Sequence, residues 1–159
     1  MTNFPSITDI ENMGGNVSTF LFIPCSKITS MPKPFIGKIT SAISIQSGAS
    51  WLTGLSIDNT LDYEEKEDKS QHGNTYTPIL KGAVPKLTPE YLTLFEEMSN
   101  DRFVVIHTDN NGYKYVLGTK EEGLIFVFDR KSSPNAAGLN GHNFQFSVSR
   151  AVTSPFYVI

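Results

Sequence analysis

The stretch from Thr88 to Phe128 constrains the fold most, because it predicts a capped helix followed by three strands. Thr88 can accept hydrogen bonds from the first free N–H groups of a helix, and Pro89 suits the first helical position because no donor is needed there. Leu87 and Leu92 stand at the positions of a hydrophobic staple. The apolar side chains that follow recur at spacings of three and four residues, which predicts one amphipathic helix from about Pro89 to Met98. They are Tyr91, Leu94, Phe95 and Met98.

The residues after this helix predict a β-hairpin and a third strand. Arg102 to Thr108 is rich in β-branched and aromatic residues, and its apolar run from Val104 to Ile106 indicates a central strand buried on both faces. Asp109 to Gly112 predicts a tight turn, because Asn and Gly both tolerate positive φ. Tyr113 to Leu117 is then the partner strand. After a polar loop, Leu124 to Phe128 is again almost wholly apolar and predicts the third strand.

The rest of the chain predicts a mainly β, α+β fold. Runs of β-branched or alternating residues, separated by Gly- and Pro-rich stretches, predict further strands at Val17–Ile23, Ile39–Ile45, Trp51–Ile57, Leu61–Glu65, Thr75–Lys81 and Asn143–Ser149. About nine or ten strands with one helix, in a single domain over residues 1–159, indicate a β-sandwich or a barrel. We expect long loops at residues 66–74 and 132–143, and long loops in small domains are often functional.

Composition excludes several classes of protein. The 159 residues carry a formal net charge of -3 and only 18% charged residues, so the chain lacks both the basic surface of nucleic-acid binding and the high charge of disorder. The one cysteine, Cys25, excludes an internal disulfide framework and favours a reducing compartment. Residues 1–15 lack a secretory signal, and the apolar run from Val17 to Pro24 is too short to span a bilayer. We therefore expect synthesis in the cytoplasm and no membrane partner.

The candidate catalytic and metal-binding residues do not form a recognisable motif. His72, His107 and His142 have no further ligand at metal-binding spacing, and Cys25 has no neighbouring cation in sequence to lower its pKa. The turn from Asp109 to Gly112 begins like a calcium loop, but it lacks the later ligands that such a loop requires. The acidic residues of the run 64–69 lack a predicted apolar pocket that would raise a carboxyl pKa. We predict that the chain is not an enzyme and has no cofactor, catalytic residue or metal ligand.

Two groups of apolar and aromatic residues are candidates for binding surfaces. Trp51, Tyr113 and Tyr115 could form a platform for stacking a sugar, although cross-strand packing is the commoner use of such residues. The sequence ends in four apolar residues that would be a liability if they were exposed, so we expect them to pack in the core or in an assembly interface. They are Phe156, Tyr157, Val158 and Ile159.

Several stretches in this order resemble small structural proteins of tailed phages and prophages, of the tail or head–tail junction type. They are Gly15–Pro24 with Met31-Pro32, His72–Tyr76, Arg102–Ile106 with Asp109–Gly112, Tyr115–Gly118, and Phe144–Ser147. The resemblance implies a β-rich, non-enzymatic protein that has no cofactor and assembles into a tail or neck ring or tube. Its expected partners are copies of itself and other virion proteins, and its final location is the virion. The alternative is a ligand-binding β-domain for carbohydrate or peptide.

Overall fold

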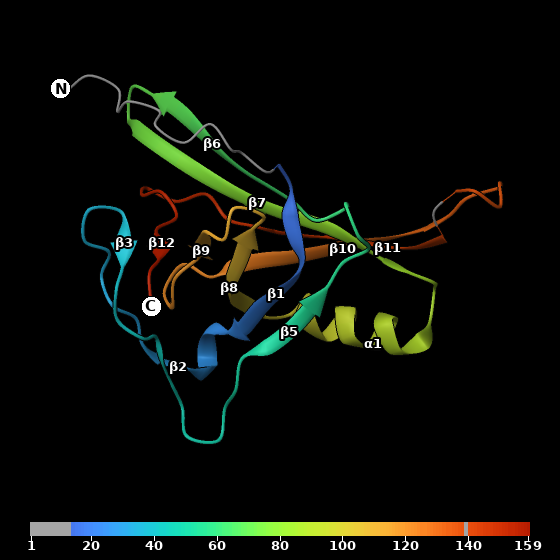
Figure 1. Cartoon of the computed structure of the whole chain (residues 1–159), viewed down its shortest axis with the longest axis horizontal. Coiled ribbons are helices and arrows are strands. Elements are labelled where there is room, and N and C mark those ends of the chain that lie inside the picture. The colour runs from blue at the N-terminus through green and yellow to red at the C-terminus, as the bar shows by residue number, and fades with distance from the viewer. Residues whose placement is uncertain (1–13, 139) are drawn as a thin grey trace.

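The computed structural model describes residues 14–138 and 140–159, which form twelve strands and one α-helix (Figure 1). A short 3-10 turn, η1 (Cys25–Lys27), follows the first strand. The elements are β1 (Asn16–Pro24), β2 (Ile28–Ser30), β3 (Lys38–Ile39), β4 (Ser44–Ile45), β5 (Leu52–Leu55), β6 (Asp62–Ser70), β7 (Gly73–Pro85), α1 (Pro89–Met98), β8 (Arg102–Asp109), β9 (Lys114–Leu117), β10 (Leu124–Ser132), β11 (Asn140–Ser147) and β12 (Phe156–Tyr157).

Ten of the described strands form two packed layers that are joined by β8, and β2 and β4 form a separate two-stranded sheet. One layer has the order β5-β1-β8-β9-β12-β3, and the other has the order β10-β11-β7-β6. β10 continues into the second layer after its first residues pair with Arg102 and Phe103 at the start of β8. The pairing is antiparallel between all named strands except β12 and β3, which are parallel. In the described part of the chain the sheet is open at β3, β5 and β6, so the mainly β, sandwich-like prediction is confirmed and the closed barrel is excluded.

β8 is the centre of the molecule, because each of its faces supports a separate apolar cluster. Phe103 and Val105 face a core that contains Phe20 and Phe22 of β1 and residues of β7, β10, β11 and α1. Val104 and Ile106 face the other way, toward a smaller cluster of isoleucines and valine supplied largely by β1, β9 and the segment between β1 and β5. The prediction of a central strand buried on both faces is therefore confirmed. Burial of Val104 and Val105 is complete.

Helix α1 closes one end of the larger core, as its capped sequence predicts. The hydroxyl of Thr88 accepts a hydrogen bond from the N–H of Tyr91 at 3.4 Å. The Phe95 ring packs edge-on against Phe126 of β10 at 5.1 Å, and Met98 is also buried. Leu94 does not follow the predicted stripe, because it lies at the margin of the helix–sheet contact and is exposed.

The β8–β9 turn has the predicted position but a different conformation. The Asp109 carboxylate accepts hydrogen bonds from the N–H groups of Asn111 and Tyr113, each at 2.9 Å. Gly112 has φ 86, and no positive φ occurs at Asn110 or Asn111. An aspartate-capped turn that ends in a left-handed glycine thus replaces the pair of left-handed residues that the Asn-Gly dipeptide predicts.

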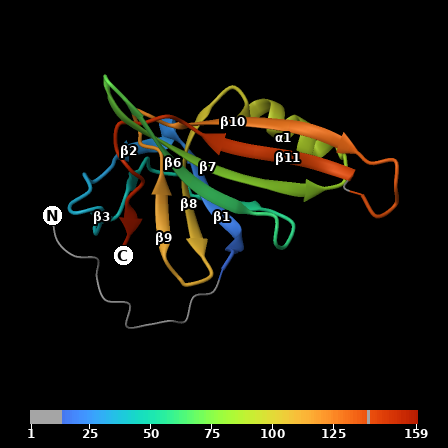
Figure 2. The same ribbon diagram turned by 90° about the horizontal axis from the view of Figure 1, so that it is seen from above.

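Three predicted segments are wrong in their bounds. Of the alternating run 39–45, only Ile39 in β3 and Ser44–Ile45 in β4 are in strands, because the chain leaves the sheet between them. Residues 66–74 are not a loop, because β6 and β7 pair as far as Ser70 and Gly73. The loop predicted at 132–143 is shorter than expected, because β10 and β11 pair as far as Ser132 and Asn140, and residues 133–138 between them are outside the strands. The two hairpins extend beyond the body of the molecule (Figures 1 and 2).

Gly54 of β5 supports a testable prediction about this packing. A Cβ at Gly54 would lie 2.2 Å from Cζ of Phe20, whose ring covers the glycine from β1 and packs on Phe144 and Phe146. We expect Gly54→Ala to lower the free energy of unfolding by about 1–3 kcal/mol, as overpacking does. Urea unfolding measures the change. Gly14→Ala is the matched control, since a Cβ there meets nothing within 4 Å; equal stability of the two variants would contradict the expectation.

Candidate assembly surfaces

The C-terminal segment is built into the sheet by its backbone, and it presents apolar side chains at its surface. The N–H of Phe156 donates to the carbonyl of Gly37 at 2.8 Å, and the N–H of Val158 donates to the carbonyl of Ile39 at 2.9 Å. On the other side, the N–H of Val116 donates to the carbonyl of Pro155. Phe156, Val158 and Ile159 are exposed. We expect Phe156, Tyr157, Val158 and Ile159 to form an assembly interface. This role stays a prediction, because contacts within one chain do not test it.

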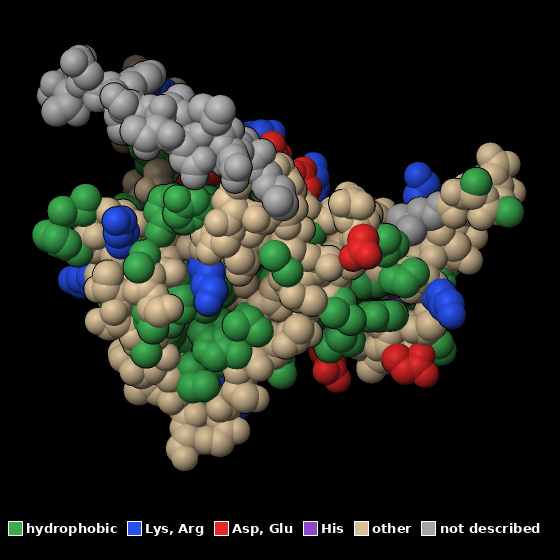
Figure 3. Space-filling view, viewed as in Figure 1, with side chains coloured by type: hydrophobic (Ala, Val, Ile, Leu, Met, Phe, Trp, Pro, Cys, Tyr) green, Lys and Arg blue, Asp and Glu red, His purple; other side chains and the backbone are tan. Residues whose placement is uncertain are grey.

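A tight turn beside this segment carries two strongly exposed apolar side chains. Phe35 is 77% and Ile36 is 81% exposed. The turn is closed by hydrogen bonds between Phe35 and Lys38 in both directions, at 2.9 and 3.1 Å. Ile36 has φ 49, a conformation that is unfavourable for a β-branched residue. We define the terminal surface as the exposed apolar side chains of Phe35, Ile36, Phe156, Val158 and Ile159. Figure 3 shows hydrophobic side chains at the left of the molecule, on the side of β3.

The opposite end of the same layer is an unpaired strand edge. In the described chain β5 pairs with β1 alone. The N–H of Ser56 donates to the carbonyl of Ser18 on β1. In an antiparallel ladder, every second residue directs its N–H and C=O groups toward the partner strand, so those of Thr53 and Leu55 face the free edge. Leu52 and Leu55 are 45% and 56% exposed.

An apolar pocket lies between β5 and helix α1. It has a volume of about 150 Å³, and its walls are almost wholly apolar. Thr53, Leu55 and Leu94 line it and are exposed, whereas the rings that line it deeper in the core are buried. The deep rings include Phe20, Phe95 and Phe144. We call this feature the β5–α1 pocket. Figure 3 shows hydrophobic side chains over the part of the surface formed by β5 and α1.

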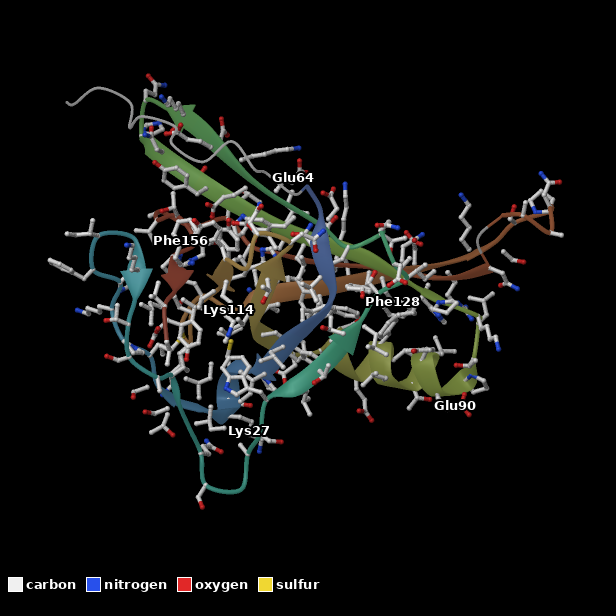
Figure 4. All side chains as sticks on the ribbon, viewed as in Figure 1. Lys27, Glu64, Glu90, Lys114, Phe128 and Phe156 are labelled. Carbon is white, nitrogen blue, oxygen red and sulfur yellow. The ribbon has the colours of Figure 1, made fainter. Side chains whose placement is uncertain are left out.

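The two ends of the layer differ in charge. The segment before and within β3 carries Lys33 and Lys38, and Lys114 of β9 lies beside Phe156 in one surface hollow. Helix α1 carries Glu90, Glu96 and Glu97, and it contains no basic residue. Figure 4 places Phe156 on the side of β3, and it places Glu90 on the opposite side of the molecule.

His107 lines a separate, polar cavity of about 730 Å³. Its ring is fully buried, and it lies 4.5 Å from the ring of Tyr63 and 4.9 Å, nearly parallel, from the ring of Tyr115. The Tyr115 hydroxyl donates to Asp109 at 3.2 Å, and neither nitrogen of His107 has a hydrogen-bond partner. Burial lowers the pKa of His107 to about 4, which outweighs the opposing effect of the Asp109 carboxylate.

The three histidines lie in different environments. His142 of β11 is buried among the rings of Tyr91, Phe95 and Phe128, and His72 is exposed at the tip of the β6–β7 hairpin. Among residues 14–138 and 140–159, no group of three His, Cys, Asp or Glu side chains could hold a metal ion.

Cys25 is a poorly reactive thiol in this environment. Its sulfur donates to the carbonyl of Thr119 at 3.4 Å. Partial burial, together with the negative charge of Asp101, raises the pKa of Cys25 to about 11 against the opposing effect of Arg102. The thiol is therefore protonated at neutral pH, and a nucleophile would need the thiolate.

The expected sugar platform is not assembled. Trp51 packs against the smaller cluster on the outer face of β8. Tyr115 packs at the border of the larger core on the opposite face, and Tyr113 contacts Phe156 with ring centroids 5.8 Å apart. The three aromatic residues therefore do not share one face of the layer.

The acidic run of β6 serves the hairpin and its neighbours. Glu64 and Glu67 form ion pairs with Lys66 and Lys69 at 3.3 and 3.7 Å. The carboxylate of Glu65 accepts hydrogen bonds from the N–H and the hydroxyl of Ser154, at 2.9 and 2.8 Å. Glu65 thereby holds the chain just before β12, a role that sequence spacing does not reveal.

Comparison with models of protein families, with curated proteins and with solved structures gives no match. In the described residues, no helix is long and apolar enough to cross a bilayer.

The pKa of His107 predicts how stability depends on pH. A folded-state pKa of about 4 lies below the ordinary 6.5, so the unfolded chain binds the proton more tightly. This contribution to stability is complete above about pH 6.5 and is lost as the pH falls toward about 4, with a total of about 3 kcal/mol. Urea unfolding from pH 7.5 to 4.5 should show a shallower pH dependence for His107→Phe, which keeps a ring between Tyr63 and Tyr115. An unchanged pH dependence would contradict this expectation.

The environment of Cys25 predicts slow modification. A pKa near 11 leaves roughly a hundredfold less thiolate than the ordinary value of 9. Because a more basic thiolate is also a better nucleophile, reaction with a disulfide reagent at pH 7.5 should be about tenfold slower than for free cysteine. The rate is measured by absorbance of the released thiol. The urea-unfolded chain is the control and should react at the free rate; a folded protein that reacts equally fast would refute the prediction.

Proposed function

We propose that this chain is a non-enzymatic structural subunit that associates head to tail with copies of itself. The observation that carries the proposal is the presence of two different apolar surfaces at opposite ends of one strand layer. The terminal surface lies beside β3 and is flanked by lysines, whereas the β5–α1 pocket lies at the other end and is flanked by glutamates. Each surface is thus suited to meet the other in a second copy.

A contact between two different surfaces has consequences for the form of the assembly. Such a heterologous contact repeats from copy to copy, and it gives a closed ring if the rotation closes or a helical tube if it does not. Burial of the exposed apolar side chains favours association, and the opposite charges favour one orientation and suppress the reverse. Rings and tubes are the assemblies that the resemblance to tail and neck proteins of phages implies.

We extend the proposal to the setting that this resemblance implies. The subunit is made in the cytoplasm and becomes part of a phage or prophage virion, where other virion proteins contact it. The net charge of -3 supports protein partners over nucleic acid.

Ligand binding is the second candidate function. The polar cavity at His107 supports it, because Tyr63 and Tyr115 line it together with the charged groups of Asp62, Lys81 and Asp109. A carbohydrate or peptide is the class of ligand that such a mixture of rings and polar groups suits.

Light scattering over a wide concentration range, with negative-stain images of any large species, tests the proposal. We expect defined oligomers, rings or tubes. Val158→Asp should raise the dissociation constant at least tenfold, because it places a charge in the contact; this corresponds to about 1.4 kcal/mol. A point variant is preferable to deletion of residues 155–159, since deletion would also remove β12 from the sheet.

Val152→Asp is the matched control, because Val152 and Val158 are both 53% exposed but only Val158 belongs to the terminal surface. Equal effects of the two substitutions would reject the terminal surface as the contact. A wild-type protein that remains a monomer at all concentrations would refute self-association and favour the ligand-binding candidate.

A further inference from the structure

We propose that the turn from Phe35 to Lys38 of one copy inserts into the β5–α1 pocket of the next copy, with the Phe35 ring as the inserted group. The inference rests on the proposed head-to-tail association and specifies its contact. The two sites lie at opposite edges of one layer, separated by five strand spacings or roughly 24 Å, so a turn and a pocket of the same copy cannot meet.

The size and lining of the pocket match a phenyl ring. The pocket has a volume of about 150 Å³, roughly that of an apolar cavity that accommodates a benzene molecule. The lining aromatic rings, among them Phe20, Phe95 and Phe144, offer edge-to-face contacts to an added ring. Leu55 and Leu94, both exposed, stand where they can close around the neck of an inserted side chain.

The turn combines two unfavourable features that an insertion explains. Phe35 and Ile36 are large apolar side chains that remain almost wholly in water in the free subunit. Ile36 also adopts φ 49, which is costly for a β-branched residue, and Gly37 follows with φ 70. Strained backbone of this kind is characteristic of functional sites, where it fixes a side chain in a required direction. Here it holds Phe35 and Ile36 at the apex of a closed turn.

Charge complementarity gives the contact its orientation. Lys33 and Lys38 flank the turn. Glu90 and Glu97 lie four residues before and three residues after Leu94, so they share the helix face that borders the pocket. When Phe35 enters the pocket, the lysines approach these glutamates.

Disulfide trapping between two single-cysteine variants tests the contact. Both variants carry Cys25→Ser, which keeps a donor for the Thr119 carbonyl. One carries Ile36→Cys at the tip of the turn, and the other carries Leu94→Cys at the mouth of the pocket. Under mild oxidation the mixture should form the 36–94 disulfide, identified by mass spectrometry, at least tenfold faster than a mixture of Ile36→Cys with Leu87→Cys. Leu87 and Leu94 are both 41% exposed, but only Leu94 lines the pocket.

The possible outcomes separate this inference from the proposed function. If the Cys25→Ser protein assembles and the Leu94 mixture reacts no faster than the Leu87 mixture, the insertion is refuted and self-association stands. Rapid cross-linking of either variant with itself indicates a symmetric contact and also refutes the insertion. A strictly monomeric protein refutes both proposals.

Two further measurements do not depend on introduced cysteines. Phe35→Ser should weaken self-association at least tenfold without lowering the urea midpoint, because the Phe35 side chain contributes little to the core of the free subunit. Benzene that binds the pocket should disperse the assemblies. Assemblies that persist with benzene bound, or with Phe35 removed, would overturn the insertion.

Discussion

Burial of β8 on both faces is the constraint on which the rest of the structure depends. A strand whose side chains are apolar on both faces needs a layer on each side. The second layer and α1 cover Phe103 and Val105, and the segment between β1 and β5 covers Val104 and Ile106. That segment does not extend over the whole outer face, because exposed Leu21 and Leu55 remain on neighbouring strands. The exposed apolar side chains at the β5 edge are therefore those that this segment leaves uncovered.

The same arrangement separates structural polar groups from surfaces that are available for binding. His107 is buried between two tyrosine rings, and the Cys25 thiol is partly covered, so neither group projects from the surface of the free subunit. The edges at β3 and β5 instead leave apolar groups in water at opposite ends of one layer. A head-to-tail contact would satisfy both ends at once, which a monomer with two unmatched edges cannot do.

Local signals in the sequence predicted the local structure well. The cap at Thr88 and the turn at Asp109 depend on hydrogen bonds within a few residues, so they are visible in the sequence. The sequence does not predict that the strands extend to Ser70 and Ser132. Both extensions are polar, and a polar run pairs in a hairpin as readily as an apolar one when the partner strand follows closely in the sequence. The terminal residues 156–159 were singled out from composition, but Phe35 and Ile36 were not. Their exposure depends on the fold, and the β5–α1 pocket joins segments far apart in sequence.

The pairing of β8 with strands near and far in the sequence favours one order of assembly within the chain. The β8–β9, β10–β11 and β6–β7 hairpins each close a short loop, whereas the pairing of Phe20 with His107 closes a much longer one, so we expect β1 to reach β8 after the hairpins form. Until β1 arrives, one edge of the most apolar strand is open to pairing with a strand of another chain. The interval between hairpin formation and the docking of β1 is thus the stage of folding at which this protein is most exposed to misassembly.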